Sequence, residues 1–207
     1  MALRQQTPIY ANGIYFPGTA RLTVFLAITI QEEGFFPSLC SIKHKIDNPV
    51  WLWLYLFIIS KLPELGDTFF IVARKSKLHF LHWYHHITVF IYSFYLCAHP
   101  HSSMIWYAGM NFAVHAMMYT YYTLRAARVP IPRCLAMFVT TCQLSQMVVG
   151  VVIQVTAAYL VYVEDKSCDC TTRDILFGMT IYLSYMVLFA DFFYRSYFGK
   201  RDKVKKS

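Results

Sequence analysis

Apolar residues form six long stretches along the chain, and short polar segments separate them. The stretches cover about residues 14–30, 50–73, 79–98, 103–124, 134–163 and 175–198. Each of the last five can cross a hydrocarbon core about 30 Å thick, which needs roughly 20 helical residues. The first stretch is marginal because it is short and contains Pro17, Gly18 and Arg21. The pattern predicts an all-α fold, a polytopic membrane bundle of about six transmembrane helices.

The composition agrees with a membrane protein and disfavours a soluble globular one. Of the 207 residues 57% are apolar and 18% aromatic, while 14% are charged, against a usual charged fraction of about 25%. The mean hydropathy is +0.40. Because no internal repeat, low-complexity tract or linker is visible, we expect residues 1–207 to form one membrane-embedded domain. Within it, residues 1–13 are an N-terminal segment and residues 199–207 a basic tail.

The formal net charge of +8 is distributed unevenly between the two sides of such a bundle. If all six stretches cross, twelve basic residues lie on one side: Arg74, Lys75, Lys77, Arg125, Arg128, Arg133, Arg195, Lys200, Arg201, Lys203, Lys205 and Lys206. The other side holds four, which are Lys43, Lys45, Lys166 and Arg173. The positive-inside rule therefore places the C-terminus in the cytosol. Basic residues in short loops suit a membrane surface, and this distribution excludes nucleic acid as a partner.

Three histidines stand out inside the third apolar stretch. His82, His85 and His86 are spaced i, i+3 and i+4, so they share one face of a helix. Ionisable groups at membrane depth are costly and normally face a bundle interior or a water-filled cavity. A lone histidine is more often a hydrogen-bonded packing residue. Three on one face, with His115 on a later apolar stretch, indicate an active site or a metal site.

Further polar residues interrupt the other stretches at helical spacings. Lys61, Glu64 and Asp67 follow one another at intervals of three, so opposite charges one turn apart can offset each other's desolvation. The alternative is a cluster that snorkels at the end of its helix. Later stretches carry Asn111, His115, Tyr119, Tyr122, Gln143 and Gln146. For these tyrosines and glutamines, interhelical hydrogen bonds and a role in ligand binding are equally open interpretations.

Taken together, these residues resemble the very-long-chain fatty-acid elongase family, the 3-ketoacyl-CoA synthases of the endoplasmic reticulum. The resemblance covers about residues 18–200 and rests on four motifs in order. They are Lys61-x-x-Glu64-x-x-Asp67-Thr68, His82-Trp83-Tyr84-His85-His86, Asn111-x-x-x-His115-x-x-Met118-Tyr119-x-Tyr121-Tyr122, and Thr140-x-x-Gln143-x-x-Gln146. The sequence is most similar to the subgroup acting on saturated and monounsaturated chains, because it has Lys77 at the position five residues before His82. The N-terminal helix of the family is missing from this sequence.

The resemblance implies the condensation of a long-chain acyl-CoA with malonyl-CoA, with loss of CO2, to a 3-ketoacyl-CoA two carbons longer. It implies that His85 takes the acyl group and that His115 acts close to it, on the malonyl unit or as a second imidazole contact. His82 and His86 would orient these groups, while Asn111 and Gln143 donate to carbonyl oxygens. The substrate-binding set is Lys61, Glu64, Asp67, Asn111, Tyr119, Tyr122, Gln143 and Gln146.

The same resemblance implies a closed substrate tunnel, entered by CoA from the cytosol, with the histidines midway. Malonyl-CoA and acyl-CoA are substrates, and neither a further cofactor nor a metal is expected. Membrane lipid surrounds the protein, and the resemblance leaves room for a homodimer and for association with the reductases and dehydratase of the elongation cycle. Lys203 and Lys205 lie five and three places from the end, where they resemble a retrieval signal for the endoplasmic reticulum.

The cysteines are expected to tie two loops together on the lumenal side. The alternation of spans makes residues 31–49 and 164–173 lumenal, and the lumen is oxidising. From spacing alone the pairing is open, because Cys97 and Cys170 lie near the same side. The resemblance implies the pair Cys40 and Cys168, since relatives carry one cysteine in each of these loops.

Two other interpretations compete with a condensing enzyme. A membrane di-iron desaturase or hydroxylase also uses His-x-x-His-His boxes, because imidazole suits iron. Such enzymes belong to families with three histidine boxes and about eight ligands. In this chain His99 and His101 lie in a loop and are expected to be solvated. A lipid- or metabolite-binding transporter, or a non-catalytic truncated isoform that binds lipid, explains buried polar groups but not three imidazoles on one face.

Overall fold

The computed structural model describes residues 3–40, 46–73, 75 and 79–199. Within these residues all regular secondary structure is helical, which confirms the all-α prediction. The helices are α1 (Leu3–Glu33), α2 (Phe35–Cys40), α3 (Asn48–Ala73), α4 (Phe80–Ala98), α5 (Ser103–Ala126), α6 (Arg133–Tyr162) and α7 (Thr172–Tyr197). Each apolar stretch from residue 50 onward becomes one helix, and its observed ends lie within a few residues of the expected ones. The short α2 was not expected.

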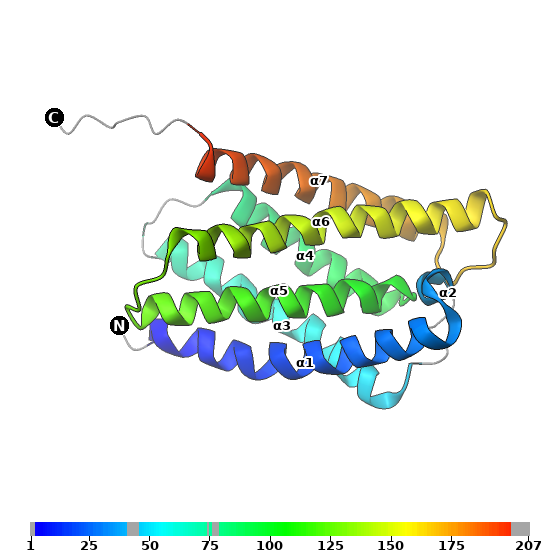
Figure 1. Ribbon diagram of the computed structural model, residues 1–207, viewed down its shortest axis with the longest axis horizontal. Coiled ribbons are helices and arrows are strands. Elements are labelled where there is room, and N and C mark those ends of the chain that lie inside the picture. The colour runs from blue at the N-terminus through cyan, green and yellow to red at the C-terminus, as the bar shows by residue number, and fades with distance from the viewer. Residues whose placement is uncertain (1–2, 41–45, 74, 76–78, 200–207) are drawn as a thin grey trace.

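The six long helices lie side by side and form a ring (Figure 1). In the order α1, α5, α6, α7, α4 and α3, each helix contacts the next, and α3 returns to contact α1. The helix α2 lies at one end, beside the start of α5. The first turn of α1 and the last turn of α7 both lie at the opposite end of the bundle. Residues far apart in sequence therefore meet in the interior of the ring.

The first helix is longer than the expected stretch of residues 14–30 and runs through Pro17 and Gly18. Its close packing against α5 explains this continuity. A Cβ atom at Gly18 would lie only 2.9 Å from the Phe112 ring, so the glycine lets the two helices approach each other. Tertiary contacts of this kind routinely outweigh intrinsic helix propensity. The helix ends at Gly34, whose φ of 91° suits a residue without a side chain.

Local hydrogen bonds mark where α3 and α7 begin. The Asp47 carboxylate accepts a hydrogen bond from the Val50 backbone N–H at 2.9 Å, which caps the first turn of α3. At α7, Thr171 and Asp174 form a capping box, in which each side chain accepts from the backbone N–H of the other. These caps satisfy N–H groups that have no partner within the helix.

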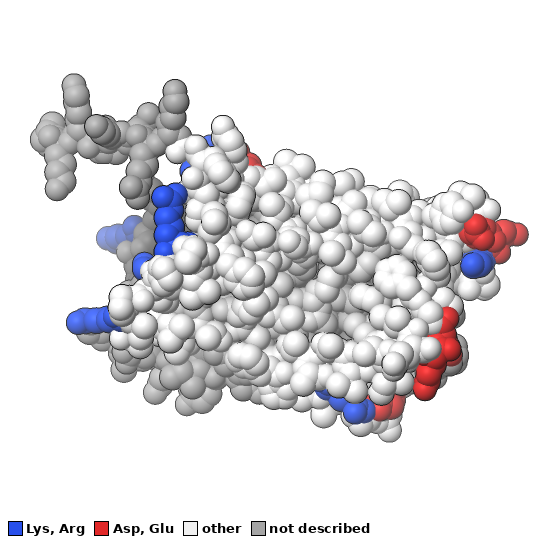
Figure 2. Space-filling model, viewed as in Figure 1, with Lys and Arg blue, Asp and Glu red and all other residues white. Residues whose placement is uncertain are grey.

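On the surface shown in Figure 2, charged side chains gather at the two ends of the bundle. On the face in Figure 2, Lys and Arg side chains gather at one end, Asp and Glu at the other with a few basic ones, and the middle is white. Of the described helices, α6 and α7 are long and apolar enough to cross a membrane. Large apolar side chains such as Val152 and Val187 are more than half exposed along them.

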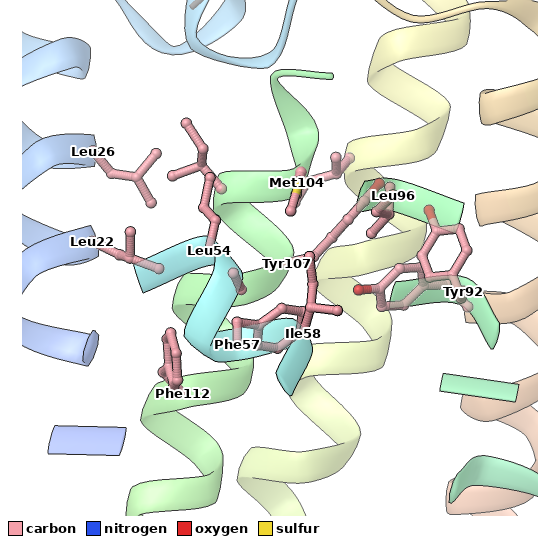
Figure 3. Packing of buried hydrophobic residues seen from close by; sticks show 14 of the residues in the cluster. Leu22, Leu26, Leu54, Phe57, Ile58, Tyr92, Leu96, Met104, Tyr107 and Phe112 are labelled. Carbon is pink, nitrogen blue, oxygen red and sulfur yellow. The ribbon is translucent and has the colours of Figure 1, made fainter. Parts of the chain in front are cut away.

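The interior contains a continuous cluster of buried apolar and aromatic side chains. Figure 3 shows Leu22 and Leu26 of α1, Leu54, Phe57 and Ile58 of α3, Tyr92 and Leu96 of α4, and Met104, Tyr107 and Phe112 of α5 converging there. Helices α6 and α7 add Met147, Ile153, Ile181, Tyr182, Tyr185 and Phe189. Every long helix therefore contributes to one core, and the polar residues described below are embedded in it.

Candidate functional site

A buried ion pair on α3 forms the centre of the candidate site. The Lys61 Nζ atom donates to Glu64 Oε1 at 2.7 Å, and the two side chains are 0% and 2% exposed. The spacing i, i+3 places both on one face of the helix, as the sequence predicts. Their burial rules out the snorkelling interpretation. Buried charges of opposite sign persist only with good geometry and further hydrogen bonds, and the neighbouring helices supply these.

Helices α5 and α1 complete the polar network around this pair. Lys61 Nζ also donates to Asn111 Oδ1 at 2.6 Å, and His115 Nδ1 lies 3.6 Å from Glu64 Oε1. Tyr15 of α1 donates its hydroxyl to the same Glu64 oxygen at 2.7 Å. Asn111 and His115 are one turn apart on α5, so the two ends of the ion pair meet one helix face. We call Tyr15, Lys61, Glu64, Asn111 and His115 the Glu64 network.

The Glu64 network has unused hydrogen-bonding capacity. Glu64 Oε2 and His115 Nδ1 are buried and have no hydrogen-bond partner within the described part of the chain. Buried polar atoms are paired in most native structures, so each exception needs an explanation. A carboxylate that crowds its donors onto one oxygen can accept a further proton or hydrogen bond on the other. The network can therefore take part in proton transfer or bind a polar group.

The histidine box of α4 divides into two parts. The rings of His82 and His86 lie 4.3 Å apart between centroids, as i, i+4 neighbours should. His85 faces α7 instead, with its ring centroid 4.8 Å from that of Tyr185 and 5.7 Å from that of Phe189. His82 Nε2 and His86 Nδ1 are buried without a described partner, so both can still bind a proton donor or acceptor.

One small cavity is lined by a residue of the histidine box and by a residue of the Glu64 network. Its wall includes His85, Asn111 and Gln146, each from a different helix. The remaining wall is apolar and aromatic: Phe57, Val89, Tyr92, Ser93, Leu96, Tyr107, Met147, Ile181, Tyr182 and Tyr185. Its volume of about 30 Å³ is room for one or two water molecules, so an acyl chain does not fit unless these side chains move. A larger open groove of about 940 Å³, beside Tyr95, contains none of the predicted site residues.

The other predicted substrate-binding residues are spread over the bundle. Tyr119 is buried and stacks on Tyr15 with the ring centroids 5.3 Å apart, whereas Tyr122 is 47% exposed. Gln143 donates to the sulfur of Met118 at 3.4 Å and is absent from the described cavity wall. The side chain of Asp67 lies outside the described part of the structure.

Tyr15 is the main residue of the site that the sequence analysis missed. It lies in the marginal first stretch, where no periodic polar pattern marks it. Its partner Glu64 is 49 residues away, and only the packing of α1 into the ring brings them together. Tyr185 was also missed, because an aromatic residue in an apolar helix gives no signal of its own.

The end of the bundle near α2 is held by covalent and polar contacts. A disulfide joins Cys40 to Cys168, the pair that the resemblance implies, with 4.5 Å between their Cα atoms. Cys40 ends α2 rather than lying in a loop. Asp169 is the residue after Cys168, and its backbone N–H donates to the Cys40 carbonyl at 2.9 Å. Burial, followed by the charge of Asp169, raises the pKa of the Cys170 thiol to about 11, so this thiol stays protonated at neutral pH.

Two expectations about the other histidines can be compared with the structure. His101 was expected to be solvated, but it is 3% exposed beside the start of α5, because the loop before that helix packs against the Cys168 loop. His99 is exposed, as expected. In the described residues no group of three or more His, Cys, Asp or Glu side chains is arranged to hold a metal ion, so the di-iron interpretation gains no support.

These features define a buried polar cluster inside an all-helical bundle, two of whose described helices are long and apolar enough to cross a membrane. Residues 13–206 match the ELO family, described as the GNS1/SUR4 family, and the chain belongs to this family.

Individual relatives are similar over most of the chain. It is 42% identical over 191 residues to very long chain fatty acid elongase 6 of Gallus gallus, covering 91% of this chain and 71% of the relative. For elongase 6 of Drosophila melanogaster the identity is 46% over 182 residues, with 87% and 58% covered. For elongase 3 of Mus musculus it is 38% over 187 residues, with 90% and 68% covered. No solved structure matches the chain.

Proposed function

We propose that this chain is the condensing enzyme of fatty-acid elongation, an acyltransferase that joins a long-chain acyl-CoA to malonyl-CoA. One observation carries the proposal. His85 and Asn111 line the same small cavity, and Asn111 is joined through Lys61 and Glu64 to His115. One imidazole therefore lies on the cavity wall, and a second is linked to that wall through a polar network. Similarity to relatives named very long chain fatty acid elongases supports the substrate class.

The proposed first half-reaction forms an acyl-imidazole at His85. The imidazole nitrogen attacks the thioester carbonyl of acyl-CoA, the tetrahedral intermediate collapses, and the C–S bond breaks. The imidazole proton passes to the leaving thiolate, which departs as CoA. Asn111 and Gln146 line the same cavity wall, and we assign them to donate to the carbonyl oxygen as it gains negative charge.

The proposed second half-reaction forms the new carbon–carbon bond. Malonyl-CoA loses CO2, and the electron pair of the broken bond becomes the carbanion of acetyl-CoA, stabilised as its enolate. This carbanion attacks the acyl carbon on His85 and expels the imidazole as its anion, which takes up one proton from solvent; the product is a 3-ketoacyl-CoA two carbons longer. We assign His115 to the malonyl unit, because its imidazole is fixed beside Glu64. Lys61 offsets the Glu64 charge there.

The proposal includes a membrane topology in which α1, α3, α4 and α5 span together with α6 and α7. All six lie side by side, and the shortest, α4, has 19 residues and is about 28 Å long. Helices packed alongside two spans, with apolar side chains outward, cross the same layer. We assign the C-terminus to the cytosol, because most basic loop residues lie on the same side as the C-terminus in this topology. We place the protein in the endoplasmic reticulum on the tail residues Lys203 and Lys205, which lie outside the described residues.

Product analysis tests the proposal directly. Purified protein is incubated with acyl-CoAs of graded length and malonyl-CoA, and 3-ketoacyl-CoA products are detected by mass spectrometry. With acyl-CoA alone, the peptide containing His85 should gain the mass of the acyl group, and hydroxylamine should remove it. Folded protein that yields neither product nor acylated peptide with any chain length would overturn the proposal.

A further inference from the structure

Tyr15 of α1 reaches the centre of the site through its hydroxyl. The side chain is 2% exposed, and its Oη atom lies 2.7 Å from Glu64 Oε1. Lys61 donates to that same oxygen at 2.7 Å. Two donors on one carboxylate oxygen fix the rotation of the carboxylate, and each also stabilises its charge. Glu64 is therefore held from two helices, α3 and α1.

The ring of Tyr15 is held as firmly as its hydroxyl. It stacks on Tyr119, with the ring centroids 5.3 Å apart and the planes 15° apart. It also lies against His115 at 5.3 Å and edge-on to Phe112 at 5.6 Å. The three neighbours all come from α5, which is the helix that carries His115. The position of α1 against α5 therefore determines where the hydroxyl points.

The geometry passes this constraint on to His115. Its Nδ1 atom lies 3.6 Å from Glu64 Oε1, the oxygen that accepts from Tyr15 and Lys61. When a carboxylate faces one imidazole nitrogen, it favours the tautomer with the proton on that nitrogen and leaves the other nitrogen unprotonated. A small movement of the carboxylate is enough to complete the hydrogen bond. The orientation of Glu64 thus sets which nitrogen of His115 is available to the substrate.

We propose that Tyr15 is a positioning residue of the condensation site: with Lys61 it orients Glu64, and Glu64 sets the tautomer of His115 that acts on the malonyl unit. The inference rests on the proposed function. It makes α1 a part of the reactive site, although α1 contributes no residue to the cavity wall. Tyr15 is absent from the cavity wall on which we place the acyl group, so its loss should affect only the second half-reaction.

The chain contains a matched control for the test. Tyr95 also donates its hydroxyl to a buried carboxylate, that of Asp174, at 2.5 Å. It lies in the last turns of α4, outside the cavity wall and outside the Glu64 network. Tyr15→Phe and Tyr95→Phe each keep the ring and remove one hydroxyl. Any loss of stability common to both variants can therefore be separated from an effect on the reaction.

The two half-reactions are measured separately in both variants, per amount of folded protein. For Tyr15→Phe we expect acylation of His85 at the parental rate and yield. Condensation with malonyl-CoA should be slower by about 10–100-fold in kcat, the usual cost of losing an orienting partner, with KM for acyl-CoA unchanged. Tyr95→Phe should match the parent in both steps. In a Glu64→Gln background, Tyr15→Phe should cause no additional loss, because its route to His115 is already broken.

The outcomes separate this inference from the proposed function. If the parent acylates His85 and condenses, but Tyr15→Phe condenses at the parental rate, then the positioning role is wrong and the proposed function stands. An equal loss in acylation and condensation, or an additive loss in the Glu64→Gln background, would also overturn it. If the parent itself neither acylates nor condenses, the proposed function fails and the inference with it.

Discussion

Two buried carboxylates in this protein each accept a hydrogen bond from a tyrosine hydroxyl, yet they are satisfied in different ways. Asp174 accepts from Tyr95 on Oδ1 at 2.5 Å. It accepts from the Thr171 backbone N–H and hydroxyl on Oδ2, both at 2.7 Å. Glu64 receives Tyr15 and Lys61 on Oε1 alone, while its buried Oε2 has no described partner. The two residues are 5% and 2% exposed, but Asp174 also lines the open groove beside Tyr95, whereas Glu64 does not.

The difference separates structural use of a buried charge from reactive use. A carboxylate with partners on both oxygens is fully engaged and serves to fix the first turn of α7. A carboxylate with one free oxygen, beside a buried ammonium and an imidazole, is stabilised as a charge but can still respond to a proton or a ligand. The comparison therefore supports the proposed role of Glu64 in the chemistry and a structural role for Asp174, and each role can be tested by substitution.

The largest effect is expected at the two proposed catalytic histidines, His85 and His115. His85→Ala and His115→Ala should each reduce condensation at least about a thousandfold, since nucleophilic and general-base groups contribute on that scale. Product formation from acyl-CoA and malonyl-CoA measures the loss. His99→Ala, at the exposed C-cap of α4, is the control and should keep parental activity. If His85→Ala and His115→Ala both kept most of the parental activity, the histidine mechanism would be refuted.

The next prediction exchanges charge for amide at the two carboxylates. Glu64→Gln leaves the Lys61 ammonium buried without its counter-charge, which should destabilise the fold by about 3–5 kcal/mol. The remaining folded protein should condense about a hundredfold more slowly. Asp174→Asn keeps an acceptor at the cap, so activity should stay within about twofold and stability should fall by about 1 kcal/mol. Thermal unfolding and product formation, measured together, distinguish the two. If Glu64→Gln and Asp174→Asn lost activity equally, the two carboxylates would not differ in role as proposed.

The sequence predicts the fold well where length and hydropathy decide it. The five stretches after residue 50 give α3 to α7, because an apolar segment of about 20 residues has few alternatives to a helix. The first stretch was underestimated, since the packing of Gly18 against Phe112 cannot be read from local propensity. The six-residue α2 was missed because it lies in a loop without helical periodicity.

The candidate site is predictable along each helix but not between helices. Spacing alone pairs Lys61 with Glu64 and places Asn111 one turn from His115. It cannot say that Lys61 reaches Asn111, 50 residues away, or that His85 turns toward Tyr185 on α7. Tyr15 carries no signal at all, because a single tyrosine in an apolar stretch resembles a packing residue. Contacts of this kind depend on which helices are neighbours in the ring.

A third prediction concerns the disulfide near Asp174, and it affects stability rather than chemistry. The bond between Cys40 and Cys168 closes a loop with a sequence separation of 128. Removing it in Cys40→Ser/Cys168→Ser should lower stability by about 4–5 kcal/mol in the chain-entropy model. The folded fraction should still acylate His85. Exchanging the exposed free thiols in Cys97→Ser/Cys134→Ser is the control and should change neither quantity. A double variant as stable as the parent would show that the bond does not hold this end.

The smallest effect is expected at the cap that engages Asp174. Thr171→Val removes one donor from Asp174 Oδ2 and one acceptor from the Asp174 backbone N–H, and it leaves the Tyr95 contact in place. The loss of an N-cap oxygen costs about 1 kcal/mol, which thermal unfolding can detect against Thr180→Val, whose hydroxyl bonds only within its own helix. Because Thr171 and Tyr95 share one carboxylate, Thr171→Val and Tyr95→Phe should be non-additive in stability. Neither should slow condensation. If Thr171→Val reduced activity by more than its loss of folded protein explains, Asp174 would have to be assigned to the chemistry as well, and full satisfaction of a carboxylate would no longer mark a structural role here.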